Sequence, residues 1–140
     1  MLVEVNNQTK KRINISLVKK IAELFLQTYH FNNKEISLAF VNDQISKKLN
    51  KTYRGIDKAT DVLSFSMTDV DNDNFLGEII INYEQIKRQA KQAGHNIQQE
   101  LIFILVHGLL HLAGYDDATE KGADEMDKLG KKFINLCQIF

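Results

Sequence analysis

Two hydrophobic patterns alternate along the first half of this chain, and only one of them continues into the second half. Short apolar or alternating segments, which favour β-strands, occur at residues 2–5, 36–41, 62–65 and 77–83. Apolar residues at helical spacing predict helices at residues 16–29, 42–54, 83–93, 97–113 and 119–136. This order favours an α/β domain with some α+β character, in which about five helices pack on a small, mixed, mostly parallel sheet of about four strands.

Polar residues and glycines mark the expected ends of these helices. Some side chains accept hydrogen bonds from the first backbone N–H groups of a helix, and residues of this type stand at three expected helix starts: Ser16, Asn42-Asp43 and Asn96. Glycines follow the second, third and fourth helices. The polar segment at residues 69–74 is expected to form a loop. In the last helix one apolar stripe is expected to be buried, and it comprises Met126, Leu129, Phe133 and Leu136.

Length and composition are those of an ordinary globular domain. The chain has 140 residues, of which 44% are hydrophobic, so we expect a single domain over residues 1–140 with a substantial core. No apolar run approaches the roughly 20 residues of a membrane span, and the N-terminus lacks an apolar signal sequence. Cys137 is the single cysteine, which excludes a disulfide within the chain. These features favour a cytoplasmic protein without membrane association.

Charge is distributed unevenly, although the formal net charge is zero. Of the 18 basic residues, 11 lie at or before Lys58, whereas 13 of the 18 acidic residues follow it. The basic half could carry a surface that binds phosphate groups. Two solvated surfaces of opposite sign explain the same distribution, so charge alone does not decide the function.

The pattern with the clearest chemistry is a pair of histidines followed by a glycine and an acid. His107 and His111 are four positions apart in a predicted helix, so their rings project from one face, with Cα atoms about 6 Å apart along the axis. Gly114 can end the helix and reverse the chain, which lets Asp117 return beneath the histidines. Two imidazoles and one carboxylate leave a fourth position for water, the composition of a catalytic zinc site. Asp116 could hydrogen-bond one of the ligand histidines.

Other interpretations of this pattern remain open at this point. Paired histidines on an apolar helix can be core residues that bond to backbone or water. A metallopeptidase would need Glu directly after the first histidine as general base, and Gly108 stands there instead. Two histidines and an acid also describe the ligands of iron oxygenases, but those sites usually lie in β-barrels, and this chain has too few predicted strands.

Three sequence blocks carry a resemblance to a known family. Residues 107–117 read HGLLHLAGYDD, residues 49–65 read LNKTYRGIDKATDVLSF, and residues 76–79 read LGEI. Their sequences and the spacing between them resemble the YbeY family of bacterial endoribonucleases over nearly the whole chain. Residues 1–140 are therefore expected to form a single YbeY-like metal-dependent hydrolase domain.

Three positions depart from the family pattern. Asp117 stands where a third histidine is usual, and a carboxylate is an accepted zinc ligand that shifts metal preference toward harder ions such as Mn²⁺. Ala59 replaces the customary proline of the second block, which loosens that loop without removing a reactive group. Glu78 replaces aspartate in the third block and keeps the charge.

The resemblance implies an activity, a cofactor and partners. It implies a zinc-dependent endoribonuclease specific for single-stranded RNA, acting in ribosomal RNA maturation and ribosome quality control, with one Zn²⁺ or another divalent ion per chain. The expected substrate is chiefly small-subunit ribosomal RNA, and ribosomal proteins or ribosome-associated factors are the expected partners. A catalytically silent, metal-containing ribosome-assembly factor is the alternative.

The resemblance also singles out Arg54 as a catalytic and substrate-binding residue. Its guanidinium is always charged and offers a planar fork that matches phosphate oxygens. Lysines between residues 47 and 58 could extend this surface along an RNA backbone. They could equally be solvated side chains on an exposed helix.

Overall fold

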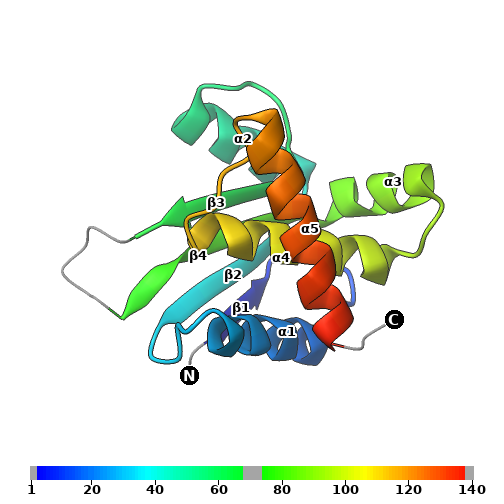
Figure 1. The fold of residues 1–140 in the computed structure, drawn as a ribbon. Coiled ribbons are helices and arrows are strands. Elements are labelled where there is room, and N and C mark those ends of the chain that lie inside the picture. Colours follow the sequence, from blue (N-terminus) through cyan, green and yellow to red (C-terminus); the bar gives the residue numbers. More distant parts are fainter. Residues whose placement is uncertain (1–2, 68–73, 138–140) are drawn as a thin grey trace.

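The computed structural model describes residues 3–67 and 74–137 of the chain (Figure 1). The strands are β1 Val3–Asn7, β2 Glu35–Val41, β3 Val62–Ser66 and β4 Phe75–Asn82. The helices are α1 Ile15–Thr28, α2 Asp43–Arg54, α3 Tyr83–Ala93, α4 Ile97–Leu112 and α5 Glu120–Cys137. The predicted α/β fold, with its mixed, mostly parallel four-stranded sheet and five helices, is confirmed within these residues. The predicted loop at residues 69–74 lies, except for its last residue, outside them.

The sheet has the order β1-β2-β4-β3. β1, β2 and β4 are parallel, and β3 joins the edge of β4 in the antiparallel direction. Parallel neighbours need a crossover connection, and α1 provides the one between β1 and β2. β3 and β4 are consecutive in the chain and can therefore pair antiparallel. Among the strands that the structure describes, β3 thus lies at one edge of the sheet and has a partner strand on one side.

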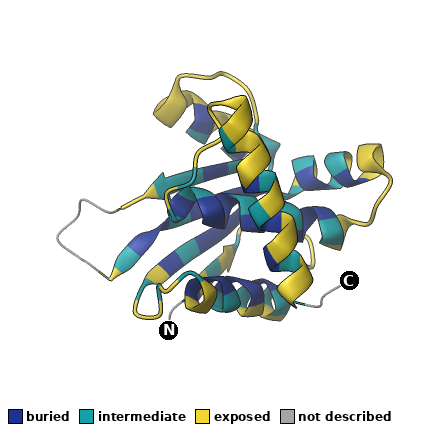
Figure 2. Cartoon of the chain, viewed as in Figure 1, coloured by how far each residue is buried: buried dark blue, intermediate teal, exposed yellow. Residues whose placement is uncertain are grey.

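Alternating side chains divide the core between the two faces of the sheet. In β4, Ile79 and Ile81 belong to the large core that α1, α4 and α5 complete, whereas Ile80 points to the opposite face. There it packs with Leu63 against the apolar side of α2. Figure 1 shows α1, α4 and α5 in front of the sheet, and Figure 2 shows that the central strands and α4 are the most deeply buried elements. The helices α2 and α4 therefore lie on opposite faces of the β3 edge.

Polar contacts hold α2 at both of its ends. At the N-terminal end, Asp43 accepts two hydrogen bonds of 2.6 and 2.9 Å from the Arg88 guanidinium and one of 2.8 Å from Asn82. The Arg88 hydrogen bonds are the main cause that holds the pKa of Asp43 well below its usual value. Towards the C-terminal end, buried Asn50 donates to the Lys58 carbonyl at 2.9 Å. These contacts fix the helix that ends in Arg54.

Two details of the predicted helices are wrong. The N-cap of α1 is Asn14 and not Ser16, because the helix begins at Ile15, two residues before the start that a Ser16 cap would give. The Asn14 side chain accepts a hydrogen bond from the Leu17 N–H at 3.1 Å. In α5, Leu136 is 65% exposed. The buried stripe continues from Phe133 to the partly buried Cys137, four residues on, where burial raises the pKa of the thiol. Among the helices of the described residues, none has the length and apolar character that a membrane span requires.

Candidate metal centre and substrate pocket

Helix α4 places the two histidines of the motif side by side. The helix begins with a capping box between Asn96 and Gln99, and its apolar residues are buried against the sheet. His107 and His111 lie on the partly exposed side of the same helix. Their Nε2 atoms are 3.2 Å apart and their ring centroids 4.8 Å. The i, i+4 spacing therefore brings both nitrogens to one point, as expected.

The turn after α4 returns Asp117 to the histidines. Gly114 has a φ of 103°, a left-handed conformation that glycine adopts without a steric penalty. The Tyr115 ring packs edge-on against Tyr29, with ring centroids 6.3 Å apart, and anchors the turn to α1. Asp117 then lies with Oδ2 at 3.2 Å from His107 Nε2 and Oδ1 at 3.6 Å from His111 Nε2.

Asp116 has a different role from the one expected. Its carboxylate accepts a hydrogen bond from the Ala118 N–H and so closes the loop that carries Asp117. Among the described residues it makes no hydrogen bond to either histidine.

The three side chains fit a metal ion. One ligand atom from each of His107, His111 and Asp117 can be chosen so that all lie within 4.8 Å of one another. Donors about 2.0–2.2 Å from one tetrahedral ion are about 3.3–3.6 Å apart, close to the 3.2 and 3.6 Å separations observed. Converging lone pairs at these distances need a cation or a proton between them, so this cluster suits a divalent metal ion.

Close packing of α4 on the sheet explains why a glycine, Gly108, follows His107. A Cβ atom on Gly108 would lie 3.1 Å from Ile79 Cγ2 and 3.3 Å from Ser64 Oγ. The Ser64 hydroxyl also donates to the Gly108 carbonyl at 3.4 Å. A glutamate at this position would therefore point into β3 and β4, away from the metal cluster.

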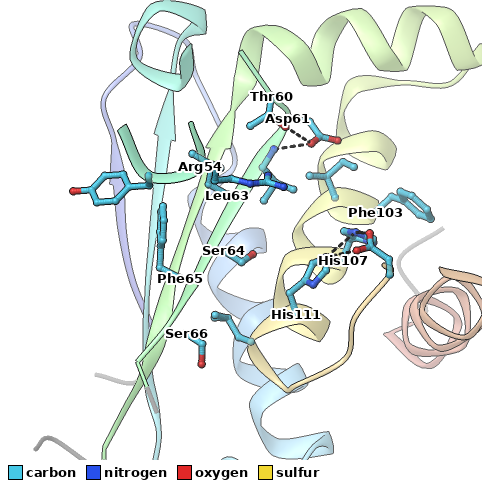
Figure 3. Close-up of a pocket in the computed structure, with 15 residues that line it drawn as sticks. Arg54, Thr60, Asp61, Leu63, Ser64, Phe65, Ser66, Phe103, His107 and His111 are labelled. Atoms are coloured by element: carbon cyan, nitrogen blue, oxygen red, sulfur yellow. Dashed lines mark hydrogen bonds and ion pairs between the residues drawn. The ribbon is translucent and has the colours of Figure 1, made fainter. Parts of the chain in front are cut away.

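The metal cluster and Arg54 line one pocket of about 790 Å³. Arg54 reaches it from the end of α2, the histidines from α4, and the wall between them is β3 (Figure 3). Figure 3 shows the Arg54 side chain extending across the pocket toward α4. The four residues singled out from the sequence therefore come together in space. None of the lysines between residues 47 and 58 lines this pocket.

Sequence reasoning missed other residues of the pocket. Phe103 lies one helical turn before His107, so the same four-residue spacing could have placed it on this wall. Ser64 and Ser66 alternate with Leu63 and Phe65 along β3, a period that could have placed the two serines together on one face of the strand. No pattern in the sequence predicts which edge of the sheet these strand residues occupy.

Fold and pocket together define a small mixed α/β protein with a His-His-Asp cluster at the edge of its sheet. The family model of Endoribonuclease YbeY matches residues 4–138, and the chain belongs to this family.

Curated relatives agree with this assignment. The chain is 41% identical over 120 residues to Endoribonuclease YbeY of Aquifex aeolicus, covering 85% of this chain and 79% of the relative. It is 39% identical over 134 residues to that of a Nitratiruptor species, covering 95% and 87%. The solution structure of TM1509 from Thermotoga maritima is 27% identical, with a TM-score of 0.69 over 94% of this chain and 86% of that one. The predicted family is confirmed.

Proposed function

We propose that this chain is a zinc-dependent endoribonuclease that cleaves single-stranded RNA in ribosomal RNA maturation and ribosome quality control. Family membership makes it an RNA-cleaving hydrolase. The observation that supports the finer proposal is the convergence of His107, His111, Asp117 and Arg54 on one pocket. Small-subunit ribosomal RNA as substrate, ribosomal proteins as partners and a cytoplasmic location belong to the same proposal, as does a single hydrolase domain over residues 1–140.

The histidines and Asp117 are the proposed metal ligands. A zinc ion bound there would act as a Lewis acid on a phosphate oxygen and lower the pKa of a coordinated water toward about 7. The two Nε2 atoms and one carboxylate oxygen would hold it from a single side, because α4 and the Asp117 loop lie on the same wall of the pocket. The carboxylate also admits harder divalent ions such as Mn²⁺.

Arg54 is proposed to bind the phosphate that is cleaved. Its side chain is exposed and extends into the pocket that the metal cluster lines. A guanidinium can donate two parallel hydrogen bonds to phosphate oxygens and offset negative charge that develops during the reaction. The other carboxylate of the pocket, Asp61, accepts a 2.7 Å hydrogen bond from the Val62 N–H and so stabilises the backbone where β3 begins.

An exposed aromatic ring supports a preference for single strands. Tyr53 precedes Arg54 in α2, lines the same pocket and is 65% exposed. It packs edge-on against Phe65, with centroids 5.3 Å apart, which positions the ring. Bases stack on such rings when they are unpaired, whereas the bases of a duplex are already stacked on one another.

We therefore expect single-stranded RNA to be cleaved at least about tenfold faster than a perfect duplex of the same sequence, because the stacking of one base contributes about 1–3 kcal/mol. Weak sequence preference and falling affinity at higher salt should accompany this, since the Arg54 contact is to phosphate. Time courses on matched single- and double-stranded oligonucleotides test the expectation. Equal rates on both would contradict it.

A further inference from the structure

The edge strand β3 has backbone groups that pair with no strand in the described part of the chain. The Met67 N–H donates to the Leu76 carbonyl at 3.0 Å, and the Asn82 N–H donates to the Asp61 carbonyl at 2.9 Å. Backbone groups in an antiparallel pair alternate between the partner strand and the opposite side. The odd-numbered residues of β3 therefore bond to β4, and the N–H groups of Val62, Ser64 and Ser66 point to the open edge.

Of these three N–H groups, the first has a hydrogen-bond partner among the described residues. The Val62 N–H donates to the Asp61 carboxylate at 2.7 Å, a common way of blocking an edge strand. Within residues 3–67 and 74–137, the N–H groups of Ser64 and Ser66 have no hydrogen-bond partner. The edge is thus blocked at its start and open further along.

The open part of the edge lies inside the pocket. β3 forms the wall between α2, which approaches from one face of the sheet with Arg54, and α4, which approaches from the other with the histidines. Figure 3 shows Ser64 and Ser66 on the strand that borders this pocket. A substrate held by both Arg54 and the metal cluster must therefore pass along this edge.

We propose that the open edge of β3 binds the sugar–phosphate backbone of the RNA, with the Ser64 and Ser66 N–H groups donating to phosphate oxygens beside the cleaved bond. This inference rests on the proposed function. Backbone N–H groups are common donors to phosphate, and two of them two positions apart on a strand are about 6.8 Å apart. An extended peptide could pair with the same groups. RNA is favoured because Arg54 and the metal cluster, on either side of the edge, both suit phosphate.

A proline substitution removes one of these donors without breaking the sheet. Proline is tolerated on edge strands where its missing N–H faces outward, which is the case for Ser66. Ser66→Pro should weaken binding of single-stranded RNA by chelator-treated protein about tenfold, the effect of one hydrogen bond to a charged acceptor. It should lower kcat/KM for cleavage by a similar factor. Ser66→Ala is the matched reference for this comparison, because it removes the hydroxyl and keeps the N–H, so a tenfold difference between the two variants reports on the N–H alone.

The phosphate is identified from the RNA side. When single phosphates of the oligonucleotide are replaced in turn by a neutral methylphosphonate, one replacement should make Ser66→Pro and Ser66→Ala bind equally. Equal binding of the two variants to the all-phosphate oligonucleotide would overturn the proposal. If the two variants bind RNA equally and also cleave it at the same rate, the edge is more consistent with binding an extended peptide than with binding RNA.

Amide hydrogen exchange provides a measurement that does not depend on the proline variant folding. In wild-type protein, single-stranded RNA should slow exchange at Ser64 and Ser66, while Leu63 and Phe65, already bonded to β4, should change little. Unchanged exchange at the two serines would overturn the proposal. If wild-type protein protects these amides and yet leaves RNA intact, the edge contact stands and the proposed nuclease function fails.

Discussion

His111→Ala is expected to lose tight metal binding and to cleave RNA at least about a hundredfold more slowly than the wild type. The substitution removes one of three converging donor atoms, and even residues that only orient a ligand often cost 10- to 100-fold in metal affinity or activity. His111 is only partly buried, so the fold should tolerate the change. Metal content by elemental analysis and cleavage of a labelled oligonucleotide measure the two effects.

Two further variants make this experiment specific. Asp117→His should retain the metal, because imidazole is an equally good zinc ligand and the usual one in the family. His30→Asn removes an exposed imidazole remote from the pocket, where a φ of 63° is one that asparagine adopts readily, and it should behave as wild type. Full metal occupancy in His111→Ala would show that the ligands are assigned incorrectly.

Arg54→Lys is expected to lower RNA cleavage at least tenfold while metal content and thermal stability stay unchanged. Lysine keeps the positive charge but loses the planar fork that donates two hydrogen bonds to one phosphate. A tenfold loss corresponds to about 1.4 kcal/mol of transition-state stabilisation.

The control for this prediction is Arg12→Lys, which makes the same exchange at an exposed arginine outside the pocket. It should leave the rate unaltered. Arg54→Glu is the harsher variant because it places a negative charge next to the phosphate. A wild-type cleavage rate in Arg54→Glu would show that the arginine takes no part in the reaction.

The metal cluster could be predicted because its geometry is local. His107 and His111 are placed by the repeat of one helix, and Gly114 ends that helix, so the spacing of four residues alone brings the nitrogens together. The strands and helices were likewise predictable from the spacing of apolar residues. The errors at Ser16 and Leu136 arose where two residues satisfy the pattern equally. Asn14 and Ser16 are both of types that cap a helix, and the stripe after Phe133 can continue either to Leu136 or to Cys137.

The rest of the pocket depends on contacts between distant segments. Arg54 and the histidines are separated by more than fifty residues, and they share a pocket because α2 and α4 pack on opposite faces beside β3. The family resemblance, and no spacing rule, pointed to Arg54. The open edge at Ser64 and Ser66 depends on the order of the strands, which the hydrophobic pattern does not determine.

Removal and return of the metal test the central claim most directly. Purified wild-type protein should lose cleavage of single-stranded RNA after treatment with a chelator, and one equivalent of Zn²⁺ per chain should restore it. His111→Ala purified in parallel reports any contaminating nuclease and should stay inactive in every condition. Cleavage that resists the chelator, or that is equally strong in the His111→Ala preparation, would contradict a metal-dependent nuclease centred on His107, His111 and Asp117.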